Sequence, residues 1–266
     1  MRHLFAQTLR WQAVKVLVVG LASLGWGLLI PFFYAQFSDV LRSLASENPL
    51  IDQFSNFGSG NLFTIGGTIT LGLQHPIAIA FVAIFAVGAA SLAIAGERQR
   101  GTLEVLLARP LPRNGVLLAT AAALFVSVVA IFGVLVAGMV AGAAMQGLLE
   151  AVAVDQLPLV LLNGLLLWAA FLAFSLGASV SFDRAGPALG LSLAYLIVNY
   201  FLEILGSLWT DAAWLQEYSL FHHFQPGEIL AGETDPLDLL ILALAVAIPL
   251  GYALLRFPRR DLAAPA

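Results

Sequence analysis

Long apolar segments separated by short polar ones set the pattern of this chain. A membrane-spanning helix needs about 20 mostly apolar residues, and six segments reach that length. They are residues 14–37, 76–95, 115–144, 159–180, 187–208 and 237–255. The third is long enough to tilt or to extend beyond the bilayer. We therefore predict an all-α integral membrane protein whose six transmembrane helices form one domain over residues 1–266.

The first 15 residues have a different pattern from the spans. Leu4, Phe5 and Trp11 alternate with polar and basic side chains such as Arg2 and Arg10. This pattern predicts an amphipathic helix that lies on the inner leaflet, with Trp11 among the headgroups. A simple inward extension of the first span is the alternative. The apolar run that follows exceeds the roughly 7–15 residues of a signal-peptide core, so we expect the first span to be retained.

Two longer polar segments fall on the opposite side of the membrane. Residues 38–75 predict a short surface helix at 39–45, followed by a glycine-rich part without the G-x-G-x-x-G spacing of a nucleotide loop. We expect this part to be a flexible or re-entrant cap. Residues 211–236 are too polar to span and rich in aromatic side chains. They predict an interfacial segment with two short helices.

The composition agrees with a chain that lies in a lipid bilayer, and the distribution of charge predicts the orientation of the chain across it. The chain is 60% hydrophobic and 11% charged, whereas soluble domains average about 45–50% and about 25%. Basic residues favour cytoplasmic loops. With the N-terminus inside, the cytoplasmic basic residues are Arg2, Arg10, Lys15, Arg98, Arg100, Arg109, Arg113, Arg184, Arg256, Arg259 and Arg260. Only Arg42 falls outside, together with most acidic residues, so both termini are predicted to be cytoplasmic.

The same inventory excludes several classes of protein. The chain has no cysteine, which removes disulfides, thiolate metal sites and a cysteine nucleophile. It is acidic overall with scattered basic residues, so no nucleic-acid partner is expected. Its only lysine, Lys15, lacks the G-K-[ST] context of a phosphate-binding loop, so the chain is not predicted to hydrolyse ATP itself. No H-E-x-x-H motif occurs, and we predict no catalytic residues.

The inner loop between the second and third spans is the most patterned polar segment. Its leucines, Leu103, Leu106 and Leu107, recur at helical spacing among charges of both signs. Gly101 and Thr102 predict a helix start, in which the Thr102 hydroxyl caps the helix and Glu104 lies near the positive end of its dipole. Pro110 and Pro112 end the helix. We predict a short amphipathic helix beneath the membrane; a lipid-facing loop would explain the leucines but not the charges.

Residues 97–113 closely resemble the signature of ABC type-2 permeases. That signature reads E, three residues, G-T-L/M-E/D, one residue, L-L, two residues, P, two residues, R. The matching positions are Glu97, Gly101, Thr102, Leu103, Glu104, Leu106, Leu107, Pro110 and Arg113. The position after the second span, the inner side and the six-span plan with a polar outer segment between the last two helices are also those of the family.

The resemblance implies that this loop is a coupling helix seated in a cleft of a separate ATPase subunit. The expected coupling residues are those nine together with Arg98, Arg100 and Arg109, and the charged contacts would be Glu97, Arg98, Arg100, Glu104 and Arg109. It also implies ATP and magnesium in the partner ATPase, a second permease copy or homologue as a dimer, and a multi-pass position in a prokaryotic inner membrane. Export is the expected direction.

Polar residues near or within the outer halves of the spans are the remaining candidates. Asn199 and Glu203 lie one turn apart, so they share a face of the fifth span. They either line a translocation path or reach a polar outer cap. His222 and His223, with Glu228 nearby, suggest a metal site, but neighbouring histidines on a helix diverge and a third strong ligand is missing. We therefore predict a polar cap and no metal.

Two further motifs concern packing. Gly138 and Gly142 form a GxxxG pair, which either marks a close helix contact or reflects the abundance of glycine. Asn163 within the fourth span predicts a packing hydrogen bond. The leading functional hypothesis is an export-type ABC permease, and the alternatives are an ATP-independent channel or secondary carrier and a membrane-embedded enzyme. The mostly apolar interior favours a lipid-like or amphipathic cargo.

Overall fold

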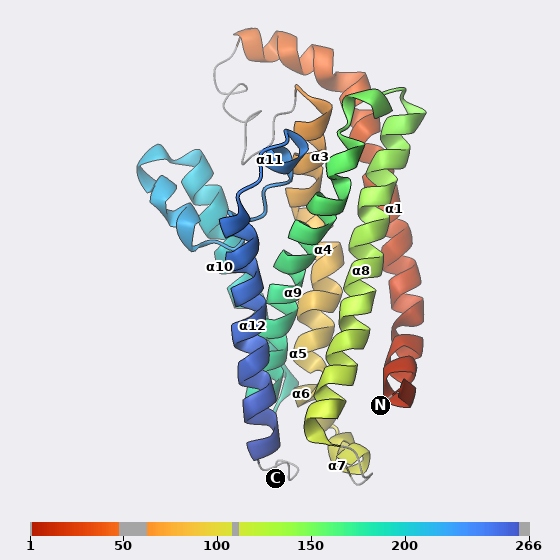
Figure 1. The fold of residues 1–266 in the computed structure, drawn as a ribbon, viewed down its shortest axis with the longest axis vertical. Helices are drawn as coiled ribbons and strands as arrows, with labels where there is room; N and C mark the ends of the chain where they lie inside the picture. The colour runs from red at the N-terminus through yellow and green to blue at the C-terminus, as the bar shows by residue number, and fades with distance from the viewer. Residues whose placement is uncertain (1, 48–62, 108–111, 261–266) are drawn as a thin grey trace.

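The computed structural model describes residues 2–47, 63–107 and 112–260, and the regular elements in these ranges are all helical. Long helices lie side by side in an elongated bundle, and α1 begins at the end of the bundle where α12 ends (Figure 1). The long helices are α1 (Arg2–Glu47), α8 (Arg113–Met145), α9 (Leu157–Ser181), α10 (Ala185–Leu208) and α12 (Pro236–Arg259). Each is long and apolar enough to cross a membrane. Their bounds confirm the predicted third to sixth spans within a few residues.

The second predicted span is longer than expected and bent. It comprises α3 (Ile65–Gln74), α4 (Pro76–Ala83), the π-helical η1 (Ile84–Ala89) and α5 (Ala90–Leu92). The two parts meet at 49°, and together they make a sixth candidate span among the described residues. We expected a flexible or re-entrant cap over residues 65–74. These residues are helical, and the bent pair has the length and composition of a broken span or of a re-entrant segment. The glycines there allow close packing: a methyl group on Gly72 would lie 2.8 Å from Cγ1 of Ile30.

Side chains from other helices satisfy the backbone at this break. Pro76 has no N–H, so the carbonyl of Gly72 loses its helical partner. The indole N–H of Trp26 donates to that carbonyl at 3.0 Å, and the Tyr200 hydroxyl donates to the carbonyl of Gln74 at 3.3 Å. Freed backbone groups need such partners in a bilayer, so α1 and α10 hold the broken span in place.

The helix α1 is continuous, so it does not begin with the separate interfacial helix that we predicted. Residues 2–15 contain neither glycine nor proline to break it, and the structure matches the alternative of a helical extension. The predicted surface helix at 39–45 is the last part of the same helix. Figure 1 shows these final turns running across the end of the bundle opposite the start of α1.

The GxxxG pair marks a close helix contact. Helix α1 packs mainly against α8. A methyl group on Gly138 would lie 2.8 Å from the carbonyl oxygen of Leu24, and one on Gly27 would lie 2.4 Å from that of Leu135. Real Cβ atoms do not approach backbone atoms so closely, so both glycines are needed where the two helices cross. Chance occurrence does not explain the motif.

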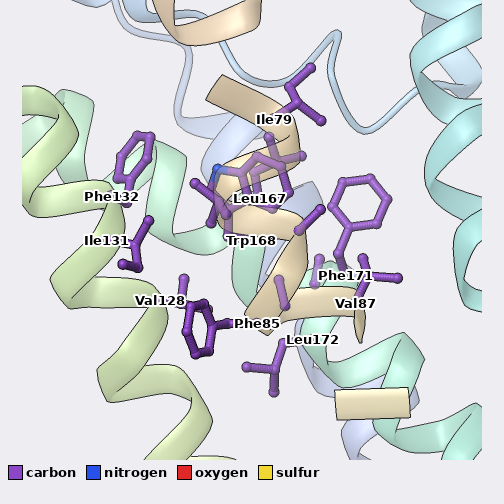
Figure 2. Packing of buried hydrophobic residues seen from close by; sticks show 14 of the residues in the cluster. Ile79, Phe85, Val87, Val128, Ile131, Phe132, Leu167, Trp168, Phe171 and Leu172 are labelled. Atoms are coloured by element: carbon purple, nitrogen blue, oxygen red, sulfur yellow. The ribbon is translucent and has the colours of Figure 1, made fainter. Parts of the chain in front are cut away.

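The core lies around α9, which contacts α8, α10, α12 and the bent segment. Figure 2 shows Phe132 and Ile131 of α8 on one side of the bent segment and Phe171 of α9 on the other, next to Val87. By contrast, α1, α10 and α12 are mostly unburied and carry exposed apolar side chains. The short elements are η2 (Leu149–Ala151), η3 (Val154–Gln156), η4 (Thr210–Tyr218) and α11 (Pro226–Leu230). The last two confirm two short helices in the polar segment before α12.

Candidate functional site

The signature residues form a helical hairpin at the end of the bundle where α8 begins (Figure 1). We call residues 95–107 the hairpin: α6 (Ala95–Gln99), a turn at Arg100 and Gly101, and α7 (Thr102–Leu107). Gly101 has a φ of +71°, which only glycine adopts without strain, and its amide donates to the carbonyl of Arg98 at 3.0 Å. The predicted helix start at Thr102 is confirmed. Arg109 and Pro110 lie outside the described residues.

The first part of the signature forms a small network inside the hairpin. The Glu97 carboxylate accepts hydrogen bonds from the Arg100 guanidinium and from the Thr102 hydroxyl. Thr102 is the first residue of α7, and its hydroxyl donates to Glu97, which makes it part of this network. The tight turn at Gly101 brings these side chains together. The spacing E-x-x-x-G-T therefore has a local structural reason.

Side chains of α9 and α6 attach the hairpin to the bundle. The hydroxyl of Ser179, which is buried, accepts hydrogen bonds from the amides of Ile94 and Ala95 at 2.9 and 3.1 Å. These amides stand at the start of α6, where a helix leaves its own N–H groups without partners. At the other end of α6, the Gln99 side-chain oxygen accepts from the amide of Ala185 at 2.8 Å, which begins α10.

Asp183, in the turn between α9 and α10, joins three parts of the chain. Its carboxylate lies 3.0 Å from Nη1 of Arg98 and also contacts the guanidinium of Arg260, which follows α12. Only 10% of the Arg98 side chain and 13% of the Arg260 side chain are exposed. Charges this buried need partners, and Asp183 provides one for both. Burial lowers the pKa of Arg260 and the Asp183 charge opposes that change, so the guanidinium stays protonated.

Arg113 completes the connection on the side of α8. Its Nη1 donates to the carbonyl of Pro258 at 2.9 Å and to that of Arg260 at 3.0 Å, which ties the start of α8 to the end of α12. Arg98 was predicted to contact an ATPase, and Arg113 was expected among the coupling residues. The structure shows each of them bonded within the chain. Sequence reasoning missed Ser179, Gln99 and Asp183. Asp183 is an acidic residue in a tight turn on the same side as the basic loops, and this position could have indicated that it pairs with an arginine there.

The exposed part of the hairpin is polar. Arg100 is 61% exposed on its side chain, and Thr102 and Glu104 are also exposed. Leu103 is fully buried in the core of the bundle, so it belongs to this chain's own packing. The side chains of Leu106 and Leu107 lie outside the described part of the structure. The predicted leucine stripe is thus supported at its first position, where it faces inward.

Asn199 and Glu203 share a buried face of α10, as predicted. Both contact the outer segment: the Asn199 side-chain oxygen accepts from the amide of Leu220 at 2.8 Å, and Gln216 donates to Glu203 at 2.8 Å. The Ser219 hydroxyl also donates to the carbonyl of Asn199. These bonds match the alternative in which the two residues support a polar cap.

His223 of this segment also holds the cap to the bundle. Nδ1 of His223 lies 2.7 Å from a carboxylate oxygen of Asp238 on α12. The Asn163 amide donates to the carbonyl of His223 at 2.9 Å and accepts from the amide of Gln225, which confirms a packing role for Asn163. Within the described residues, no three His, Cys, Asp or Glu side chains are arranged to hold a metal ion.

Comparison with known proteins shows which family the chain belongs to. The family model described as ABC-2 family transporter protein matches residues 5–262. The match includes the hairpin, the bent span and the outer segment. A search of curated proteins finds no match to the chain. Because the family match covers far more than half of its length, the chain belongs to the ABC-2 transporter family and is a multi-pass ABC permease of the membrane.

Proposed function

We propose that this chain is the membrane-spanning subunit of an ATP-driven exporter and that the hairpin is its coupling helix. The observation that carries the proposal is that the hairpin has an exposed polar side and an inner side that is bonded to the bundle. Arg100, Thr102 and Glu104 are exposed at the end of the bundle, while Ser179 and Asp183 hold the hairpin to the helices. A charged, exposed surface suits the orientation of a protein partner.

Movement of the hairpin would reach most of the bundle. It is covalently continuous with α5, and α8 follows it along the chain. Through Asp183 and Gln99 it is bonded to the α9–α10 turn, and through Arg260 to the end of α12. Closure of two ATPase subunits around ATP would push the hairpin, and these bonds would tilt the helices as a group. Packed interfaces transmit such shifts between discrete arrangements.

The remaining parts of the transporter follow from the same proposal. ATP and magnesium would be bound by the partner ATPase, because the chain lacks G-K-[ST]. A second permease copy or homologue would complete the pathway. The exposed apolar face of α10, which includes Ile197, Val198 and Phe201, supplies a surface for that copy or for lipid. The hairpin and both chain ends would lie in the cytoplasm of a prokaryotic cell, at its inner membrane.

An ATP-independent carrier is the second candidate, and one observation favours it. The bent span resembles the discontinuous helices that bind substrates in secondary transporters. In this chain, however, the carbonyls freed at the break are already bonded to Trp26 and Tyr200. Backbone groups occupied in this way cannot coordinate an ion or a substrate, so the exporter is the better supported proposal.

The test uses a charge reversal on the exposed face of the hairpin. We expect Glu104→Arg to weaken association with the ATPase encoded beside the permease by about tenfold, because charge reversal at an interface opposes binding. Co-purification and microscale thermophoresis, both in detergent, measure this association. The control is Glu217→Arg, an exposed acid at the opposite end of the bundle. Equal association of both variants, or transport without any ATPase, would contradict the proposal.

A further inference from the structure

A groove lies between the first turns of α1 and the rest of the bundle. Helices α1 and α8 are in closest contact near Gly27 and Gly138, and toward the hairpin end they separate (Figure 1). The space between them is a cavity of about 500 Å³ that extends to α5 and the hairpin. The residues that line it include Gln12, Lys15, Leu92, Arg100, Thr120 and Leu124.

The lining of the groove is amphipathic. Leu92 of α5 and Leu124 of α8 give it an apolar wall, whereas Gln12 and Lys15 of α1 and Arg100 of the hairpin contribute polar and positively charged groups. The side-chain oxygen of Gln12 is buried and has no hydrogen-bond partner among the described residues. A buried acceptor of this kind needs a donor. The groove is therefore suited to a molecule with an apolar chain and a polar head.

The local charge specifies the sign of that head. Residues 2–38 of α1 contain Arg2, Arg10 and Lys15 and no acidic residue. Glu97 also lines the groove, but its carboxylate is paired with Arg100. The Lys15 charge is therefore left in excess, and a negatively charged group would be attracted to the groove.

The surroundings of the groove identify the source of the molecule. Trp11 lines the groove and is 70% exposed, as suits an indole at the level of lipid headgroups. The next exposed residues of α1, Val14, Leu17 and Val18, are apolar and continue the surface toward the middle of the helix. The groove is thus continuous with a lipid-facing surface.

We propose that the groove binds one anionic phospholipid from the leaflet on the hairpin side. Its phosphate contacts Lys15 and the exposed guanidinium of Arg100, and one acyl chain lies along Leu92 and Leu124. A hydroxyl of a glycerol headgroup donates to Gln12. The bound lipid fills the space between α1 and the hairpin and thereby fixes their relative position. This inference does not depend on the ATPase partner.

The experiment places the full-length chain in nanodiscs with equal amounts of phosphatidylglycerol and phosphatidylcholine. Native mass spectrometry measures which lipid stays bound, and a phosphatidylglycerol with a photoreactive acyl chain locates the site by labelled peptides. We expect phosphatidylglycerol to be retained preferentially and to label α5 and α8 beside the groove. Lys15→Gln should reduce the preference about fivefold, since one basic residue near a membrane surface contributes about that much to anionic lipid binding.

Two further variants separate the groove from general surface charge. Arg10→Gln removes the same charge from the same helix at a position outside the groove lining, and it should leave the preference unchanged. Thr120→Trp fills the groove without changing charge, and it should abolish the labelling. Equal retention of the two lipids, or an equal effect of Arg10→Gln and Lys15→Gln, would overturn the proposal. So would a cross-link from Thr8→Cys to another protein chain, with no lipid retained.

Discussion

At the scale of single residues, glycines set how closely the helices pack. Gly27 and Gly138 lie where the backbones of α1 and α8 meet, and no larger side chain fits between them. The GxxxG spacing of Gly138 and Gly142 indicated such a contact but could not name the partner helix. Gly27 had no motif of its own, because its role depends on a helix more than one hundred residues away along the chain.

The glycine contact predicts a specific loss of stability. We expect Gly138→Leu to lower the free energy of unfolding by about 1–3 kcal/mol, because the added side chain forces α1 and α8 apart. Unfolding of the purified chain in mixed detergent micelles measures the change. The matched control is Gly133→Leu on the same helix, where an added Cβ meets no atom within 4 Å. A similar loss for both variants would show that the contact is unimportant.

At the scale of elements, apolar length predicted most of the bundle. The four spans from α8 to α12 were predicted within a few residues, because a long apolar run in a membrane has few alternatives to a helix. Helix α3 was missed because its glycines and threonines are typical of a loop. Gly72 is needed for close packing beside Ile30 at the bend, which is a tertiary effect that local pattern does not reveal.

The contacts that attach the hairpin to the bundle also could not be predicted from the local sequence pattern. The signature predicted where α7 begins, and its E-x-x-x-G-T spacing is explained by contacts within the hairpin. Asp183 and Ser179 come from the α9–α10 turn and from α9, far along the chain. Their pairing with the hairpin depends on how the helices are arranged. The sequence indicated the exposed face of this element, and the structure was needed to find its inner contacts.

The Asp183 contacts predict how the hairpin communicates with the helices. We expect Asp183→Asn to leave ATP hydrolysis by the assembled transporter in place while transport falls by about tenfold, because residues that link two sites modulate their coupling on this scale. The ratio of cargo moved to ATP hydrolysed in proteoliposomes measures the effect. Asp183→Glu, which keeps the carboxylate, should recover most of that ratio.

A control separates this effect from a general loss of charge. Asp211→Asn removes an exposed carboxylate in η4, at the opposite end of the bundle, and should leave the ratio unchanged. If Asp183→Asn reduces hydrolysis and transport equally, the residue serves only assembly or stability. A normal ratio in Asp183→Asn would show that the hairpin moves the helices without this contact.

At the scale of the whole molecule, the two ends of the bundle have different tasks in this account. The end with the hairpin carries the exposed Arg100 and Glu104 and the connections among α8, α9, α10 and α12. The opposite end is closed by a polar cap, which Asn163, Asn199 and Glu203 hold to the helices. This asymmetry suits the exporter that we propose, in which force would enter at the hairpin end and cargo would leave at the other.

Site-directed cross-linking can show whether an ATPase subunit binds the hairpin, as we propose. The chain contains no cysteine, so Arg100→Cys introduces a unique thiol on the hairpin and Trp214→Cys introduces one at the opposite end. Both side chains are exposed. With a short thiol-to-amine cross-linker in native membranes, we expect the ATPase to be captured from position 100 and not from position 214. Capture from neither position, or equally from both, would contradict the proposal.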